Sequence, residues 1–184
     1  MPKAIRVHKV GGPEVLTWEE VPTVPVGPRE ARVRHRAVGL NFIDVYHRTG
    51  LYPLPLPFTP GQEGAGVVTE VGAQVTEIAV GDRVAYGGGA AGAYCEERVM
   101  AADRLVKLPS GIDDRTAASM MLKGMTARYL LRDTIRIERG DTILIHAAAG
   151  GVGQIVSQWA KHLGATVIGT VGSEEKAALA KANG

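Results

Sequence analysis

Residues 142–171 place the strongest constraint on what this chain can fold into. Mainly β-branched and aliphatic residues form the short run Thr142–His146, and a glycine-rich turn follows it. A segment with apolar residues at helical spacing comes next, and Gly164 ends it before a second apolar run at 166–171. Strand, glycine turn, helix and strand within about thirty residues predict a βαβ unit with a right-handed crossover. We expect its strands to be parallel and covered on both faces.

The chain before this unit has a different character. Residues 3–108 contain short Val-rich runs separated by Gly and Pro, which predicts an all-β unit with irregular loops. We expect strands at 31–38, 64–71, 83–86 and 96–100. Four prolines between residues 51 and 60 exclude a helix or a central strand there and indicate a stiff, extended loop.

The pattern changes after residues 109–111. Residues 113–131 are rich in Ala, Met and Leu and predict a helix, and residues 135–141 predict a polar turn. A domain boundary near residue 120 follows, with one domain at 1–122 and a second at 123–184.

Composition narrows the classes of partner. The formal net charge is +2, and no run of five or more like charges indicates a nucleic-acid arm or a membrane-binding patch. No apolar stretch approaches the ~20 residues that span a bilayer. Cys95 is the one cysteine, so no intramolecular disulfide can form, and a lone thiol suits a reducing compartment. We expect a cytoplasmic protein whose partner is a small molecule or another protein.

The glycine turn carries the first functional signal. It matches the pattern G-x-G-x-x-G, with Ala148 at the first glycine, and it stands between an apolar strand and an amphipathic helix. In that context the backbone N–H groups at the helix start can donate to a pyrophosphate, which the helix dipole also favours. The alternative is a glycine-rich corner without a ligand. The predicted cofactor-binding residues are Ala149, Gly150, Gly151, Val152 and Gly153.

The end of the second strand bears on the choice of cofactor. NAD-preferring folds place Asp or Glu about 20 residues after the motif, where it binds the ribose 2′-hydroxyl. That position falls near Val171, and no carboxylate occupies it. Gly172, Ser173 and Lys176 instead offer space, a hydroxyl and a cation suited to a 2′-phosphate, which favours NADPH. The alternative is that Ser173 caps the next helix and Lys176 lies on its solvated face, while Glu174 and Glu175 would repel a phosphate unless they point away.

Four motifs in order connect these features to a known family. Residues 41–44 read NFID, 60–66 read PGQEGAG, 123–126 read KGMT, and 147–153 form the turn. The chain resembles the medium-chain dehydrogenase/reductase superfamily, and within it the zinc-free quinone oxidoreductase, or zeta-crystallin-like, branch. The resemblance implies a GroES-like β-rich catalytic domain at 1–122. It also implies a truncated Rossmann domain, with a doubly wound parallel sheet, at 123–184 and an active site in the cleft between the two.

The resemblance also bears on metal use. Alcohol dehydrogenases of this superfamily have a zinc-binding Cys where this chain has Asn41, and a zinc-binding His where it has Gln62. A catalytic zinc needs about three protein ligands and a structural zinc a cysteine cluster, so we expect neither. Zinc-free chemistry suits an acceptor that is already electrophilic, such as a quinone or an activated enone. We expect Glu63 to be a partly buried carboxylate held by neighbouring donors.

Further site residues are implied by the resemblance. Asn41 and Thr126 would lie near the nicotinamide of the cofactor, and Tyr46 and Tyr52 would border the substrate cleft as catalytic residues. Each has a structural alternative. Asn41 could cap a helix at 42–48 in which Phe42 and Tyr46 are core residues, and Tyr52 could pack against the loop prolines.

These observations support three hypotheses. The first is NADPH-dependent reduction of quinones by hydride transfer, and its rival is a 2-enoyl thioester or enone reductase of the same superfamily. The third is a non-catalytic nucleotide-binding protein. A dinucleotide-binding sheet has two mononucleotide halves, and this sequence supplies one. We therefore expect the activity in a longer, homodimeric protein that contains this chain. We expect the isolated chain to be inactive.

Overall fold

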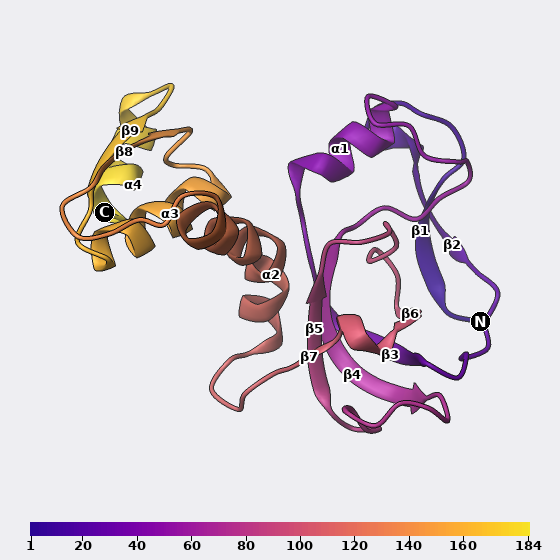
Figure 1. Ribbon diagram of the computed structural model, residues 1–184. Helices are drawn as coiled ribbons and strands as arrows, with labels where there is room; N and C mark the ends of the chain where they lie inside the picture. Colours follow the sequence, from indigo (N-terminus) through magenta and orange to yellow (C-terminus); the bar gives the residue numbers. More distant parts are fainter. The chain divides into compact units, whose positions relative to one another are not determined.

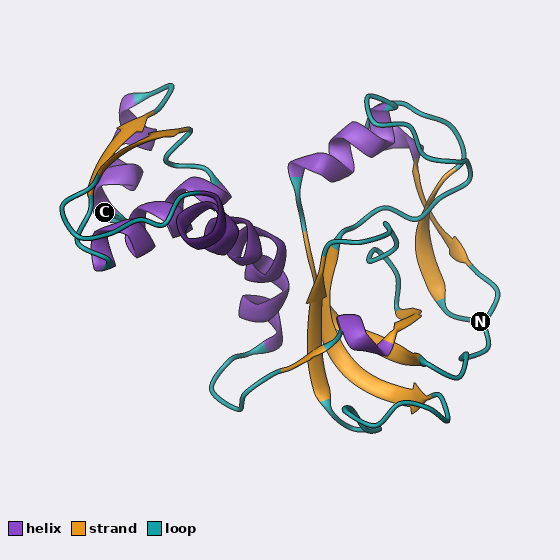
Figure 2. Cartoon of the chain, in the orientation of Figure 1, coloured by secondary structure: helices purple, strands orange, loops and turns teal.

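The computed structural model describes residues 1–184, which divide into two compact units, Met1–Leu122 and Lys123–Gly184 (Figure 1). Strands dominate the first unit, whereas helices and two short strands form the second (Figure 2). None of the helices has the length and apolar content that a membrane crossing requires.

The first unit is built from two antiparallel sheets. A five-stranded sheet has the order β6-β3-β4-β5-β7, and a separate hairpin pairs β1 with β2. The strands are β1 Lys3–Val7, β2 Leu16–Glu20, β3 Glu30–Gly39, β4 Glu63–Val71, β5 Arg83–Gly87, β6 Glu97–Ala101 and β7 Val106–Lys107, with short 3₁₀ turns at Pro13–Val15 and Ala102–Arg104. The four strands predicted from the Val-rich runs are confirmed within a residue at each end.

The sheet encloses the largest hydrophobic cluster of this unit. Ala31 and Val33, which alternate along β3, are fully buried, and so is Val84 of β5. Val68 of β4 is almost fully buried in the same cluster. This alternation is the period of two that an antiparallel strand needs to bury one face.

Two helices follow strands of this sheet in the chain. Helix α1, Phe42–Thr49, follows β3 directly and ends at Gly50, whose φ of 80° is the left-handed conformation that glycine tolerates. Helix α2, Asp114–Tyr129, begins in the first unit and extends into the second, where a wider helical turn, Leu130–Thr134, continues it. The helix predicted at 113–131 is therefore confirmed, with a longer irregular end.

The second unit contains the predicted βαβ arrangement. Strands β8, Thr142–His146, and β9, Thr166–Thr170, pair in parallel, and α3, Gly151–His162, connects them. Helix α4, Glu174–Ala182, follows β9. Ile143 and Ile145 pack in the cluster around Val156 and Ala160 of α3.

The expectation that both faces of these strands are covered is wrong for this chain. Leu144 is 59% exposed and Ile168 53% exposed, because successive side chains of a strand point to opposite faces. The odd-numbered isoleucines of β8 meet α3, and the opposite face of β8 and β9 is left open.

A buried polar pair lies inside the first unit. His35 places its Nδ1 2.8 Å from the Cys95 carbonyl oxygen, so Nδ1 carries the proton and Nε2 accepts from the Tyr86 hydroxyl at 2.7 Å. Burial lowers the pKa of His35 below its ordinary 6.5, and the charge of Arg98 adds to that effect. Burial likewise raises the pKa of Tyr86 to about 12.

This pair predicts a dependence of stability on pH. Since the folded-state pKa of His35 is lowered, the unfolded chain takes up the proton first as the pH falls. The contribution of neutral His35 to the free energy of unfolding is fully present above pH 6.5 and is lost progressively below it. We expect the melting temperature to fall between pH 7.5 and pH 5.5, and to fall less in His35→Gln. His8→Gln, which removes an exposed histidine, should retain the wild-type slope; an equal slope in all three proteins would refute the assignment.

Candidate functional site

Gly39, at the end of β3 and just before α1, is closely surrounded by other parts of the first unit. A Cβ at this position would overlap the carbonyl oxygen of Ala118 and the side chain of Glu63. Glycine therefore allows β3 to pass close to α2 and delivers Asn41 to a buried position, where it is 9% exposed.

Asn41 is part of a buried polar network. Its Nδ2 donates to Oε1 of Glu63 at 2.8 Å, and the backbone N–H of Leu122 donates to Oε2 at 2.7 Å. The Asn41 backbone N–H donates to Oδ2 of Asp44 at 3.0 Å, and the Tyr94 hydroxyl donates to the same oxygen at 2.8 Å. The prediction that donors hold Glu63 is confirmed, although this residue is fully rather than partly buried.

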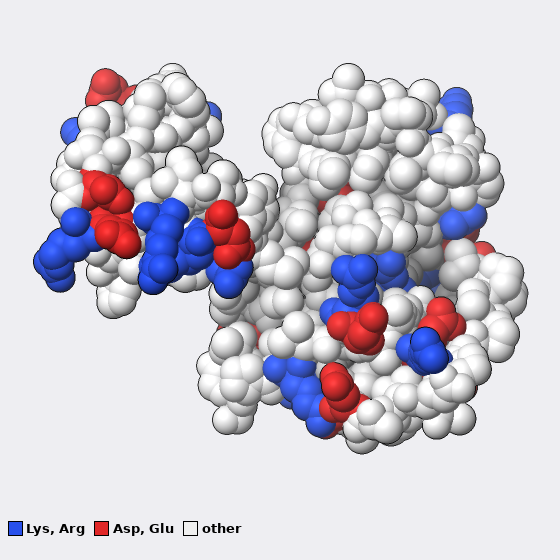
Figure 3. Space-filling model, in the orientation of Figure 1, with Lys and Arg blue, Asp and Glu red and all other residues white.

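Helix α1 presents aromatic rings on its outer side. Phe42 is 73% exposed and Tyr52 50% exposed, and between them Tyr46 makes edge contacts to both, with ring centroids 5.4 and 5.2 Å apart. The backbone N–H of Tyr52 donates to the Tyr46 carbonyl at 3.1 Å. We refer to Phe42, Tyr46 and Tyr52 as the aromatic row. The surface over α1 is drawn mostly white in Figure 3, so few charged side chains surround it.

The structural alternatives for these residues have mixed outcomes. Asn41 does occupy the cap position of α1, with extended backbone angles. The alternative that Phe42 is a core residue is wrong, because its ring lies among the most exposed large apolar side chains. Tyr52 belongs to the loop after α1, and its ring contacts the rings of Tyr46 and His47.

The glycine turn of the second unit is compact. Ala148 N–H donates to the Thr170 carbonyl at 3.1 Å, and the preceding Ala147 has a φ of 53°, which is uncommon for a residue with a Cβ. A Cβ at Gly153 would lie 2.5 Å from the Ala147 carbonyl oxygen and 2.7 Å from that of Ala148. The helix can approach the turn only because residue 153 is glycine, as the sequence pattern predicts.

The first turn of α3 is suited to an anion. It contains no acidic residue, and by helix geometry the N–H groups of Gly151 and Val152 have no acceptor within the helix. Gln154 Nε2 donates to the Ala149 carbonyl at 2.9 Å and holds the turn in place. These features match the backbone geometry that binds phosphate groups at helix N-termini.

Residues after β9 lie beside this turn, since β8 and β9 are neighbouring parallel strands that end at the same edge. Ser173 caps α4, and its Oγ accepts the Lys176 N–H at 3.3 Å, so the capping role of Ser173 is confirmed. The Lys176 side chain is exposed, and a Cβ added at Gly172 would meet nothing within 4 Å. This edge therefore has room and a cation, together with two exposed carboxylates, Glu174 and Glu175, in the first turn of α4.

The predicted site residues form two groups. The first unit brings Asn41, Tyr46 and Tyr52 together. The second brings together the turn and the residues after β9, and it also contains Thr126, half-buried in α2. Sequence reasoning missed the parts played by Asp44 and Tyr94. The N-x-x-D spacing of a capping box could have identified Asp44, whereas nothing local identifies Tyr94.

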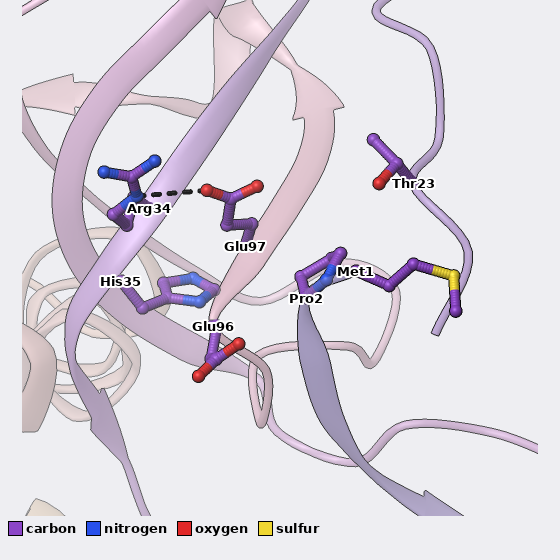
Figure 4. Close-up of a pocket in the computed structure, with 7 residues that line it drawn as sticks. All are labelled: Met1, Pro2, Thr23, Arg34, His35, Glu96 and Glu97. Carbon is purple, nitrogen blue, oxygen red and sulfur yellow. Dashed lines mark hydrogen bonds and ion pairs between the residues drawn. The ribbon is translucent and has the colours of Figure 1, made fainter. Parts of the chain in front are cut away.

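A polar cavity of about 520 Å³ in the first unit has none of the predicted site residues in its lining (Figure 4). Arg34 and Glu97 pair across one wall at 3.0 Å, and His35 forms another part. No three His, Cys, Asp or Glu side chains gather as they would around a metal ion. Burial raises the pKa of the Cys95 thiol to about 11, so the thiol is protonated at neutral pH.

Comparison with known proteins shows which families and structures the chain is similar to. Residues 27–110 match the alcohol dehydrogenase GroES-like domain. The chain is 57% identical over 185 residues to a quinone oxidoreductase of Pseudomonas aeruginosa, covering 100% of the chain and 57% of that protein. It is 50% identical over 188 residues to a 2-haloacrylate reductase of a Burkholderia species, covering 98% and 56%. The structure of the Escherichia coli quinone oxidoreductase complexed with NADPH matches with a TM-score of 0.96 and 48% identity, covering 99% and 56%.

The whole chain is similar to members of the medium-chain dehydrogenase/reductase superfamily. Its predicted fold class is confirmed, with a GroES-like β-rich part followed by the parallel strands and helices of a Rossmann-type domain. Within the superfamily, the relatives at 49–57% identity include several that are named quinone oxidoreductase. The chain spans a little over half the length of these relatives.

The glycine turn predicts a contrast between two substitutions. Gly153→Ala places a Cβ against the backbone of Ala147 and Ala148, which cannot move away without disturbing β8, and we expect a loss of about 1–3 kcal/mol in unfolding free energy. In Gly151→Ala the Cβ meets the side-chain carbons of Lys123, which can move, and we expect little change. Urea denaturation of both variants measures the difference, and equal stabilities would contradict the close approach at Gly153.

Proposed function

We propose that this chain is part of an NADPH-dependent oxidoreductase that reduces quinones by hydride transfer. The observation that carries the proposal is the glycine turn, whose open N–H groups, missing Cβ at Gly153 and lack of acidic residues fit a dinucleotide pyrophosphate. As further parts of the proposal, the domains at 1–122 and 123–184 are the catalytic and cofactor domains of a cytoplasmic homodimer.

The second unit is proposed to bind the cofactor, NADPH. In this reading Ala149, Gly150, Gly151, Val152 and Gly153 line the pyrophosphate. Gly172, Ser173 and Lys176 receive the 2′-phosphate. The exposed ammonium of Lys176 and the open space at Gly172 support this choice, as does the NADPH complex of the Escherichia coli relative.

The acceptor is proposed to lie against the aromatic row. When bound, NADPH supplies the hydride. Tyr46 and Tyr52 would offer hydroxyl donors and edge contacts to a planar ring as negative charge develops on its oxygen. Asn41 and Thr126 are proposed to contact the nicotinamide side of the cofactor. The weakly charged surface over α1 supports a neutral, planar acceptor (Figure 3).

The reaction is proposed to need no zinc. The Asn41 amide nitrogen donates to Glu63, so it presents N–H rather than a lone pair, and Gln62 also has an amide where a zinc site would have an imidazole. An electron-poor acceptor can take a hydride without a Lewis acid on its oxygen.

A second candidate function has its own support. The relative named 2-haloacrylate reductase is 50% identical to the chain, so an activated alkene such as an enone or 2-enoyl thioester is the alternative acceptor class. Its reduction would add hydride to one alkene carbon and a proton to the other, with a tyrosine of the aromatic row as the proton donor.

The test uses the full-length reductase, meaning a polypeptide that carries this chain and spans the whole length of its relatives. NADPH oxidation is followed at fixed cofactor with a simple quinone, an enone and a 2-haloacrylate. Faster turnover with the quinone supports the first proposal, and faster turnover with an alkene supports the second. Binding of NADPH without turnover of any acceptor would overturn both and leave a non-catalytic nucleotide-binding protein.

Substitution of Lys176 tests the cofactor proposal. Lys176→Ala in the full-length reductase should weaken NADPH binding by about 1.5–3 kcal/mol, the scale of one charge-assisted hydrogen bond. NADH binding should barely change, because NADH lacks the 2′-phosphate. Lys181→Ala removes an exposed lysine from the same helix and serves as the control. Fluorescence titration measures all four affinities, and equal losses for both cofactors would show that Lys176 does not discriminate between them.

Metal analysis tests the zinc-free reaction. We expect less than stoichiometric zinc after dialysis of the full-length reductase, and we expect turnover to persist in the presence of a strong chelator. About one tightly held zinc per chain, together with loss of turnover on chelation, would refute the proposed chemistry.

A further inference from the structure

Helix α1 buries two polar residues and exposes its first aromatic ring, while its other apolar residues, Ile43, Val45 and Tyr46, are half-buried. Its buried residues are Asp44 and His47, whereas Phe42 lies outward. Surface helices usually dock through an apolar stripe and expose their charges. The polar contacts of Asn41 and Asp44 therefore contribute to the position of α1.

Asp44 is the centre of those contacts. Its carboxylate is 5% exposed, and Oδ2 accepts both the Asn41 N–H and the Tyr94 hydroxyl, while Oδ1 is buried without a partner. A buried carboxylate is stable only when donors compensate its lost hydration. The Tyr94 hydroxyl thus supplies a substantial part of what keeps Asp44 in this place.

The structure holds Tyr94 firmly. Its N–H donates to the Pro60 carbonyl at 2.9 Å, and its carbonyl accepts from Ile5 N–H at 2.8 Å. Gly61, with a φ of 100°, leaves the space beside the ring, since a Cβ there would lie 2.5 Å from a ring carbon of Tyr94. Burial raises the pKa of Tyr94 and the bond to Asp44 adds to the shift, so the phenol remains a donor at neutral pH.

The hydrogen bond from Tyr94 to Asp44 affects the aromatic row through the first turn of α1. Asn41 is held at two points, by Asp44 through its backbone N–H and by Glu63 through its side chain. With eight residues, α1 is too short to be stable by itself, so the anchoring of its first turn sets the direction of the helix. Tyr46 lies one turn further on, and Tyr52 is bonded to the Tyr46 carbonyl.

We propose that Tyr94 is a positioning residue of the reductase: by donating to Asp44 it fixes the first turn of α1 and so places Tyr46 and Tyr52 against the acceptor. The effect on acceptor binding rests on the proposed function, whereas the effect on α1 does not. Tyr94 itself makes no contact with the acceptor in this scheme.

The kinetic experiment compares two tyrosines that each lose one part-buried hydroxyl. Tyr94→Phe in the full-length reductase should raise the KM for the acceptor roughly three- to tenfold, the equivalent of about one net hydrogen bond. The NADPH dissociation constant should change by a smaller factor, because Glu63 still holds the side chain of Asn41. Tyr86→Phe removes the bond to His35 at 2.7 Å and no bond to α1, and should leave acceptor KM unchanged. Equal effects of the two substitutions on acceptor KM would overturn the proposal.

A double-mutant cycle tests whether Tyr94 acts through Asp44. Asp44→Asn preserves the shape of the side chain while removing its charge, so Tyr94→Phe should have a smaller effect on acceptor KM in that background. Fully additive effects would show that Tyr94 acts by another route. If Tyr94→Phe does not fold, Asp44→Asn with Tyr86→Phe as its control provides the same comparison.

Hydrogen exchange provides a readout that needs no turnover. We expect amide exchange at residues 41–48 to become faster in Tyr94→Phe and to remain at the wild-type rate in Tyr86→Phe. Unchanged exchange in α1 of a folded Tyr94→Phe variant would refute the proposal, even in an active enzyme. A wild-type protein that reduces no acceptor, but whose α1 exchange responds to Tyr94→Phe, would refute the proposed function and leave the anchoring of α1 supported.

Discussion

The buried carboxylate of Glu63 is the interaction on which the candidate site of the first unit depends. It lies at the start of β4 and joins the cap of α1, through Asn41 Nδ2, to α2, through Leu122 N–H. Taking an ionised carboxylate out of water costs several kcal/mol unless donors replace the lost hydration. Removing either donor would lose part of that compensation, so the contacts of Glu63 help to hold the three segments together.

Close backbone approach is the second constraint, and in each unit one glycine provides it. Gly39 lets β3 pass the Ala118 carbonyl and the Glu63 side chain, and Gly153 lets α3 start against the carbonyls of Ala147 and Ala148. In both cases the missing side chain brings a strand and a helix together at the place where the candidate site residues begin. Glycine has a packing function at these positions, beyond its freedom in φ.

Local patterns were sufficient to predict most of the fold and only part of the site. The Val-rich strands and the βαβ unit were predicted because hydrophobic periodicity and turn residues act over a few neighbouring positions. The exposed face of β8 was not, since whether Leu144 is covered depends on segments that sequence periodicity does not specify. The contact between Tyr94 and Asp44 joins residues fifty positions apart, and no local signal encodes such a pair.

The orientation of α1 connects these constraints. A helix that exposes Phe42 loses the free energy that burial of a large apolar side chain usually supplies, about 1.5–3 kcal/mol. Its compensation lies on the inner side, where Asp44 accepts hydrogen bonds from the N–H of the cap residue Asn41 and from the Tyr94 hydroxyl. Hydrogen bonds are directional whereas apolar burial is not, so a helix held by them has a defined position as well as a stable one. An aromatic surface that must present its rings at fixed positions therefore gains from being anchored by a buried polar network.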